Sequence, residues 1–357
     1  MKYLRKFNEA LSESELSKIE EEVLKLFPHL RGHVTINPQD GTIDVHNELF
    51  IFLGREKFTG TKLPFKFGHI ANQFFIQEVP LTTLEGCPHT TERFAILNTQ
   101  VTDLVGGPQS VEAYSIGSCN NLISLKGLSH TIDSLSIKWC PVTSLEGCPS
   151  YIGRYFSIEH LHITDLVGGP KEVDGICNIS GHTITSLEGI PTRVEFLYFN
   201  CPNVWDPSPL RNVQILSDDL MRIDGPLKYL IGFFCLIFDG GIDDDGIFFK
   251  GDWWDKFRES LDYNYVRQRD GKWEINHFRF LEALSEFDFE PNNLDSRIKE
   301  FTSIGPYFFI DEKENRVNLM GDRIPNNDQW DSFLEDEYDE DEDYDEDYDE
   351  DYDDEED

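Results

Sequence analysis

The chain has 357 residues, enough for two or three structural units with sizeable cores. Its formal net charge is −37, from 68 acidic and 31 basic residues. Binding of a phosphate backbone needs clustered Lys and Arg, so with this balance we expect no direct binding of nucleic acid.

The cysteines, the N-terminus and the apolar stretches bear on where the protein is located in the cell. Seven cysteines form no C-x-x-C pair, and their odd number argues against a closed disulfide framework. The N-terminus lacks the apolar core of a signal peptide, and the most apolar stretch, residues 229–238, is half the length of a membrane-spanning helix. We predict a soluble, intracellular protein that does not contact a membrane.

Residues 1–66 are predicted to form an N-terminal cap. Ser12 and Glu15 have the spacing of a capping box, and apolar residues then recur at helical spacing until Pro28. This pattern predicts a helix over residues 13–27. Residues 33–45 alternate around a Pro-Gln-Asp-Gly turn, which predicts a hairpin.

Residues 67–226 contain an internal repeat. The pattern [LVI]-[TI]-[TSD]-L-x-G-x-P occurs six times, at intervals of 20 or 21 residues, and its second apolar residues are Leu84, Leu104, Leu125, Leu145, Leu166 and Leu187. The third copy departs from the pattern because Ser129 replaces Pro. The six copies consist of two similar blocks of three, which indicates a duplication.

A second apolar element follows each Gly-x-Pro. It has the period-two spacing of a short strand, as in Phe94 and Ile96 or Phe156 and Ile158. A coil of about 20 residues cannot bury its own leucines, so successive coils must stack, with their strands paired at roughly 4.8 Å. Residues 67–76 are predicted to be a divergent first coil, and residues 200–226, which lose the motif, a C-terminal cap.

Residues 227–330 lack the repeat motif, and their pattern predicts a small α+β domain. Residues 253–261 and 273–287 have helical apolar spacing, and residues 307–319 read as a hairpin. The predicted fold class is therefore α+β, mainly β: a leucine-rich-repeat-like solenoid with a helix-and-hairpin cap, a small C-terminal domain and an acidic tail over residues 331–357.

The repeat resembles that of a known family. Together with Leu63-Pro-Phe-Lys-Phe67-Gly68 and the run from Leu261 to Arg267, it is similar to the leucine-rich-repeat-like proteins of tailed, myovirus-type bacteriophages, over about residues 30–285. The resemblance implies the solenoid fold and a bacteriophage origin. That family has no established activity or binding residue to carry over.

Motifs for catalysis or metal binding are weak. The acidic loop at residues 239–252 partly fits a calcium loop, but Gly241 and Asp252 stand at its two anchor positions, so an acidic surface turn is the better interpretation. The histidines lack zinc spacing, and Cys119 and Cys140 sit at equivalent repeat positions, which favours a ladder of reduced thiols over a disulfide. With no nucleophile or phosphate-loop motif, we expect no enzyme activity, cofactor or metal.

The acidic tail has two interpretations. Residues 335–357 comprise 19 Asp or Glu and four Tyr, and without these 19 charges the remaining 334 residues still carry −18. The segment is either a disordered solubilising tail or a lure for a cationic protein surface, with tyrosines that offer stacking groups: Tyr338, Tyr344, Tyr348 and Tyr352.

The functional hypothesis is a non-enzymatic scaffold that binds an unidentified protein, with a basic surface as one option for that partner. Its binding face is predicted at strand positions that point away from the core: Arg93, Ala95, Ser115, Ser136, Lys138, Ser157, Asn178 and Tyr198. Two alternatives remain: an acidic inhibitor that occupies the nucleic-acid-binding surface of a host or defence protein, and a structural component of a virion.

Overall fold

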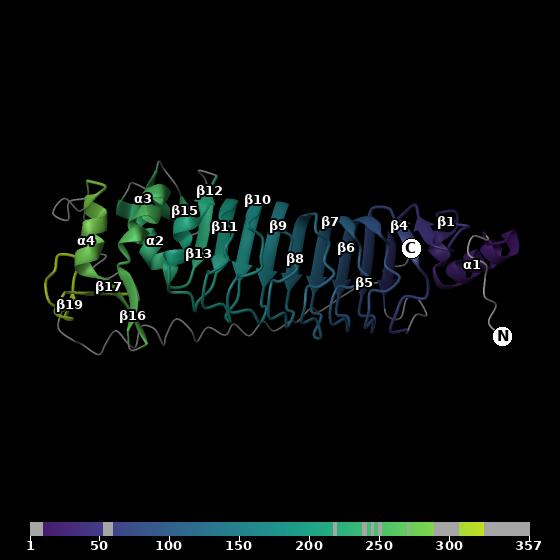
Figure 1. Cartoon of the computed structure of the whole chain (residues 1–357), viewed down its shortest axis with the longest axis horizontal. Helices are drawn as coiled ribbons and strands as arrows, with labels where there is room; N and C mark the ends of the chain where they lie inside the picture. The colour runs from purple at the N-terminus through teal and green to yellow at the C-terminus, as the bar shows by residue number, and fades with distance from the viewer. Residues whose placement is uncertain are drawn as a thin grey trace, which may run out of the picture.

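The computed structural model describes residues 10–52, 60–216, 220–237, 241–243, 246–248, 252–269, 271–288 and 307–324. Its centre is a long β-solenoid of about eight turns, with helix α1 at one end and a small domain at the other (Figure 1). This architecture confirms the predicted fold class. The acidic tail and its four tyrosines lie outside the described residues.

The solenoid strands form one continuous sheet. Parallel pairs join neighbouring coils from β3 onward, and the strands are β3 (Leu49–Phe52), β4 (Phe67–Ile70), β5 (Gln73–Gln77), β6 (Thr90–Leu97), β7 (Ser110–Gly117), β8 (Ile132–Lys138), β9 (Tyr151–Glu159), β10 (Glu172–Ser180), β11 (Arg193–Asn200), β12 (Gln214–Ile215) and β13 (Leu220–Asp224). The parallel ladder thus begins before the first coil that the repeat motif indicates.

The core consists of rows of side chains from equivalent positions in successive coils. The six predicted leucines of the motif are at most 1% exposed, and so are the residues three positions before them. Two further rows come from the strands, and one of these runs Ile76, Ile96, Ile116, Ile137, Ile158, Ile179 and Phe199. Stacking of the coils therefore buries apolar side chains that a single coil would leave exposed to water.

Each L-x-G-x-P element is a tight turn with the glycine at its third position. In the copy at Leu125, the amide of Leu128 donates to the Leu125 carbonyl at 3.0 Å, and Gly127 has φ +95°. This combination is typical of a type II turn. A Cβ on Gly127 would lie 2.4 Å from the Val105 amide nitrogen of the neighbouring coil. Glycine is therefore required here by both the conformation and the close approach of the neighbouring backbone.

The polar residue before each motif leucine also has a structural role. Asp103 accepts a hydrogen bond from the Val105 amide at 3.0 Å, and Ser144 accepts one from the Glu146 amide at 3.1 Å. The same bond recurs in the other coils. Short side chains with an oxygen on Cβ or Cγ stabilise turns in this way, which explains the restriction of this position to Thr, Ser and Asp.

The N-terminal cap covers the first coil. Helix α1 (Glu13–Leu26) begins with the predicted capping box, in which the Ser12 amide donates to Glu15 at 3.0 Å. A 3₁₀ turn at Pro28–Leu30 follows, and strands β1 (Val34–Ile36) and β2 (Ile43–Val45) form the predicted antiparallel hairpin. β2 then pairs in parallel with β4 and so joins the cap to the sheet.

The C-terminal domain packs on the last coil. A 3₁₀ helix at Ser208–Asn212 belongs to the solenoid cap, and the elements of the domain are α2 (Leu227–Ile237), β14 (Gly241–Asp243), β15 (Gly246–Phe248), α3 (Trp253–Ser260), a 3₁₀ helix at Leu261–Tyr263, β16 (Val266–Arg269), β17 (Lys272–Asn276), α4 (His277–Ser285), β18 (Phe308–Ile310) and β19 (Arg316–Val317). The Trp254 indole donates to the Val213 carbonyl at 3.0 Å, which ties α3 to the solenoid cap.

One prediction in this domain was wrong. The stretch 273–287 was expected to be a single helix, but its first residues form β17, and α4 starts only at His277. Asn276 caps that helix by accepting from the Arg279 amide at 3.0 Å. β17 pairs with both β16 and β18, and this long-range pairing overrides the helical spacing of the local sequence.

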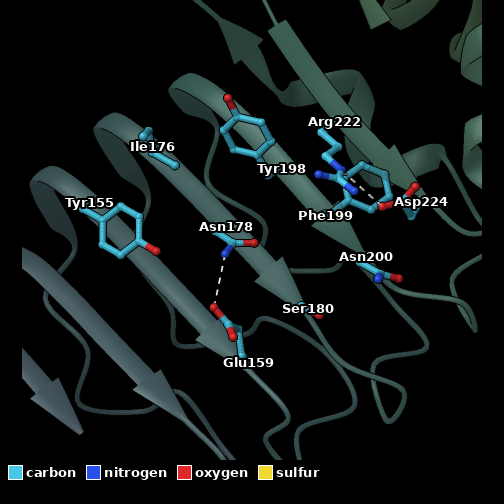
Figure 2. Close-up of a pocket in the computed structure, with 10 residues that line it drawn as sticks. All are labelled: Tyr155, Glu159, Ile176, Asn178, Ser180, Tyr198, Phe199, Asn200, Arg222 and Asp224. Carbon is cyan, nitrogen blue, oxygen red and sulfur yellow. Dashed lines mark hydrogen bonds and ion pairs between the residues drawn. The ribbon is translucent and has the colours of Figure 1, made fainter. Parts of the chain in front are cut away.

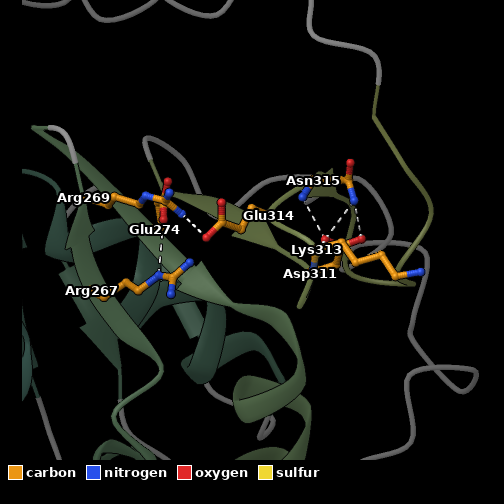
Figure 3. A network of polar contacts seen from close by, with 7 residues as sticks. All are labelled: Arg267, Arg269, Glu274, Asp311, Lys313, Glu314 and Asn315. Carbon is orange, nitrogen blue, oxygen red and sulfur yellow. Dashed lines mark hydrogen bonds and ion pairs between the residues drawn. The ribbon is translucent and has the colours of Figure 1, made fainter.

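The domain's four-stranded sheet carries surface ion pairs (Figure 3). Arg267 pairs with Glu274 at 3.3 Å, and Arg269 pairs with Glu314. In the β18–β19 turn, Asp311 accepts from the amides of Lys313 and Asn315, and these bonds, that of Asn315 first, lower its pKa. The network orders a turn and one face of the sheet.

A glycine comparison tests the turn. Gly127→Ala is expected to lower the free energy of unfolding by about 2–5 kcal/mol, because it combines left-handed strain with a backbone clash. Gly32→Ala is the control. Gly32 has φ +79°, but apart from its chain neighbours no heavy atom of the described residues lies within 4 Å of the position that its new methyl group would take. Only the strain of about 1–2 kcal/mol therefore applies. Urea unfolding followed by circular dichroism measures both, and equal losses would contradict the close-approach argument.

A tyrosine comparison tests the core. The Tyr114 hydroxyl is buried without a hydrogen-bond partner among the described residues, and it fills the space beside Gly107. Tyr114→Phe is expected to leave stability unchanged or to raise it by about 1 kcal/mol, because it removes an unsatisfied polar group. In the matched Tyr265→Phe variant, a buried bond to Ser260 of 3.0 Å is lost, and stability should fall by about 1 kcal/mol.

Candidate binding face of the solenoid

The predicted face residues lie together on the outer side of the sheet. Six of them form one row across consecutive strands: Ala95, Ser115, Ser136, Ser157, Asn178 and Tyr198. Arg93 belongs to the row on one side, and Lys138 to the row on the other. The parallel register thus brings residues that are far apart in the sequence onto one strip.

Two of these residues are not accessible. Ser157 is fully buried and Ala95 is 8% exposed, so neither can itself contact a partner. Arg93 is exposed, and the remaining members are half-buried.

The strip is hollowed at its C-terminal end, across β9, β10, β11 and β13. The hollow has a volume of about 400 Å³ (Figure 2), and the residues that line it are Tyr155, Glu159, Ile176, Asn178, Ser180, Tyr198, Phe199, Asn200, Arg222 and Asp224. In Figure 2 the Tyr155 and Tyr198 side chains stand on either side of the strand that carries Ile176 and Asn178.

Glu159 organises one side of the hollow. Its carboxylate pairs with Lys138 at 2.6 Å and accepts hydrogen bonds from Ser157 at 3.2 Å and from Asn178 at 3.4 Å. Three of the predicted face residues therefore converge on a glutamate that was not predicted. These contacts hold the Glu159 side chain in place, and the Lys138 ammonium balances its negative charge.

A second ion pair lies on the opposite side. Arg222 and Asp224 approach within 3.6 Å, on the strand that follows β11 in the sheet. Between the two pairs, Ser180 and Asn200 contribute uncharged polar groups. The hollow is thus balanced in charge, with two phenol rings and an isoleucine beside amide and hydroxyl groups. This mixture is typical of surfaces that bind proteins.

The missed residues differ in how they could have been found. Tyr155 and Glu159 alternate with the inward residues Phe156 and Ile158, so strand alternation alone would have identified them. Arg222 had no such signal, because β13 lies beyond the last repeat motif. Only the tertiary structure shows that the sheet continues there.

Comparison with known proteins gives no family: no family model, curated protein or solved structure matches this chain. In the part of the chain that the structure describes, no helix is long and apolar enough to cross a bilayer. The same residues contain no cluster of three or more potential metal ligands.

The acidic loop at residues 239–252 lies only partly within the described residues. Its strands β14 and β15 pair as an antiparallel hairpin. Asp252, at the last position of the motif, pairs with Lys256 at 3.0 Å, and this contact lowers its pKa. Residues 241–243 and 246–248 are therefore strands, whereas an EF-hand calcium loop connects two helices.

The seven cysteines are all free thiols, and six are buried. The Cys119 thiol lies 3.2 Å from the Thr99 hydroxyl, in a row that continues to Cys140 in the next coil. A shared hydrogen bond with Cys119, together with burial, raises the pKa of Cys140. Burial alone raises the pKa of Cys148 and is the main reason that the pKa of Cys201 is raised, each to about 12.

Burial should make the six buried thiols inert in the folded protein. At pH 8 we expect slow reaction with Ellman's reagent, and fast reaction of all seven in guanidinium. Because the folded pKa values of Cys148 and Cys201 exceed the unfolded value of about 8.5, their burial opposes folding progressively as pH rises from about 8.5 toward 12, and stability falls over that range. Fast labelling of the native chain would contradict this assignment.

Proposed function

We propose that this protein is a non-enzymatic scaffold that binds another protein on the outer strand face of its solenoid. The observation that carries the proposal is the hollow between Tyr155 and Tyr198, where the regular strip of small residues gives way to aromatic and amide side chains. Tyrosine is enriched at the energetic centres of protein interfaces because it combines a large apolar ring with a hydroxyl.

The face is suited to such a role because it is already ordered. Parallel ladders fix each strand, and the Lys138–Glu159 and Arg222–Asp224 pairs hold polar side chains in place. A partner would therefore meet a preorganised surface, which limits the entropy lost on binding. The leucine-rich-repeat-like pattern and its resemblance to bacteriophage proteins support a bacterial host protein as the partner.

The two alternatives depend on other evidence. The inhibitor hypothesis rests on residues 335–357, which lie outside the described residues, and on the acidic charge of the remainder. The virion hypothesis has no specific residue in its support. The strand face has the stronger support because its side chains and their contacts are defined.

A crosslinking experiment tests the proposal. Tyr198 is replaced by benzoylphenylalanine in the full chain, which is then irradiated in a bacterial lysate and analysed by mass spectrometry. We expect one discrete protein adduct, and we expect Tyr155→Ala to reduce it at least about fivefold, as loss of about 1 kcal/mol at an interface aromatic would. Tyr151, which is 48% exposed at the start of β9 and does not line the hollow, is the matched control position.

The outcomes are distinct. Equal adducts from positions 198 and 151 would show non-specific contact and overturn the assignment of the face. Loss of an adduct only after truncation at Leu334 would instead favour the tail. An Arg93→Glu and Tyr198→Ala double variant extends the test, because unchanged affinity for the captured protein would show that neither end of the strip contributes.

A further inference from the structure

A second surface runs along the edge of the sheet, where each strand ends. The residue that follows each of the strands β5 to β9 has a left-handed backbone, and its amide donates to a carbonyl of the next coil. We term these residues the turn row: Glu78, Asn98, Ser118, Trp139 and His160. The row is therefore held in register by the same stacking that builds the core.

Trp139 has the largest side chain in this row. Left-handed backbone is common for Asn and tolerated for small polar residues, but it is unfavourable for a bulky side chain. The Trp139 side chain is 55% exposed, so burial in the core does not compensate for the strain. Strained, exposed aromatic residues of this kind indicate a functional site.

The Trp139 ring begins a stack. It lies 6.1 Å from the His160 ring with an interplanar angle of 9°, and His160 lies 6.0 Å from His182 at 23°. All three are exposed. His160 comes from the coil after Trp139, whereas the coil before it contributes Ser118, which has no ring to extend the stack. Among the described residues, His160 is the one ring that stacks on Trp139, so the exposed part of the indole can accept a planar group.

We propose that the Trp139–His160–His182 stack binds an arginine side chain of a basic protein partner. A guanidinium is planar and cationic, so it stacks on an indole face and is attracted by the ring's electrons, more effectively than the compact ammonium of lysine. The charge of the chain supports this chemistry, since even without residues 335–357 it carries −18. A nucleic acid base would bring phosphates that this charge repels.

Glu78 extends the surface. It stands in the turn row three coils before Trp139, about 14 Å away at the usual strand spacing. Its carboxylate accepts a hydrogen bond from Gln77 at 3.0 Å, and among the described residues no cation lies within ion-pair distance of it. An extended peptide covers about 14 Å in four residues, so arginines at positions i and i+4 match the two contacts.

The inference rests on the proposed function, because it names the chemistry of the partner. Its test uses the full chain and three blocked ten-residue peptides of Gly and Ser, with Arg, Lys or Gln at positions 3 and 7. Titration calorimetry at low salt measures affinity, and the Trp139 indole N–H resonance, assigned with Trp139→Phe, reports the contact.

We expect the Arg peptide to bind about two- to fivefold more tightly than the Lys peptide, and to shift the Trp139 resonance. Trp139→Asn, which installs the residue found at position 98, should abolish that preference while leaving Lys-peptide binding unchanged. Glu78→Gln should weaken both cationic peptides alike. Phe278→Ala is the control, because Phe278 is another exposed aromatic residue, with 59% exposure. It should change neither the affinity of the cationic peptides nor the preference for arginine.

Two results would overturn the inference. The first is equal binding of the Arg and Lys peptides that Trp139→Asn does not change. This result would show that negative charge alone attracts the peptides, because the acidic residues 335–357 attract both cations. A shift of the Trp139 resonance by maltohexaose but not by the Arg peptide would identify a sugar-binding surface. In either case an adduct at position 198 would still support the scaffold, so the two proposals fail separately.

Discussion

The structure depends on the stacking of coils that are too short to fold alone. A coil of 20 or 21 residues can contribute only a few apolar side chains, and these are buried only when the coils before and after supply the same positions. The parallel strand ladder and the Gly-containing turns serve this single requirement. The Cβ position at Gly127, 2.4 Å from the neighbouring backbone, shows how closely the coils approach.

Stacking also separates structural positions from positions free to vary. Inward residues are constrained by their neighbours on both sides, whereas outward residues meet solvent and can differ from coil to coil. The middle row of the outer face changes along the solenoid from Ala95 through serines to Asn178 and Tyr198. The turn row changes likewise, from Asn98 and Ser118 to Trp139. Departures from the repeat on these two surfaces are the features that a function would select.

Both ends of the array are closed by different means. At the N-terminus, the β1–β2 hairpin joins the sheet through β4, and α1 packs beside it. At the C-terminus, β13 extends the sheet, and the small domain is fixed to the cap by hydrogen bonds such as that of Trp254 to Val213. Capping is needed because the last coil otherwise exposes an apolar surface and a free strand edge.

The sequence alone determined the solenoid, the buried rows, the α1 capping box and both hairpins, because each follows from local periodicity or from turn chemistry. Strand alternation also placed six face residues in one row. The rest needed the tertiary structure. β17 formed where local spacing favoured helix, since its hydrogen bonds come from β16 and β18. The hollow depends on β13, which has no repeat motif, and on contacts of Glu159 that join three coils. The Trp139 stack likewise unites residues about 21 positions apart. Such sites arise from register between coils, which sets distances that no single repeat encodes.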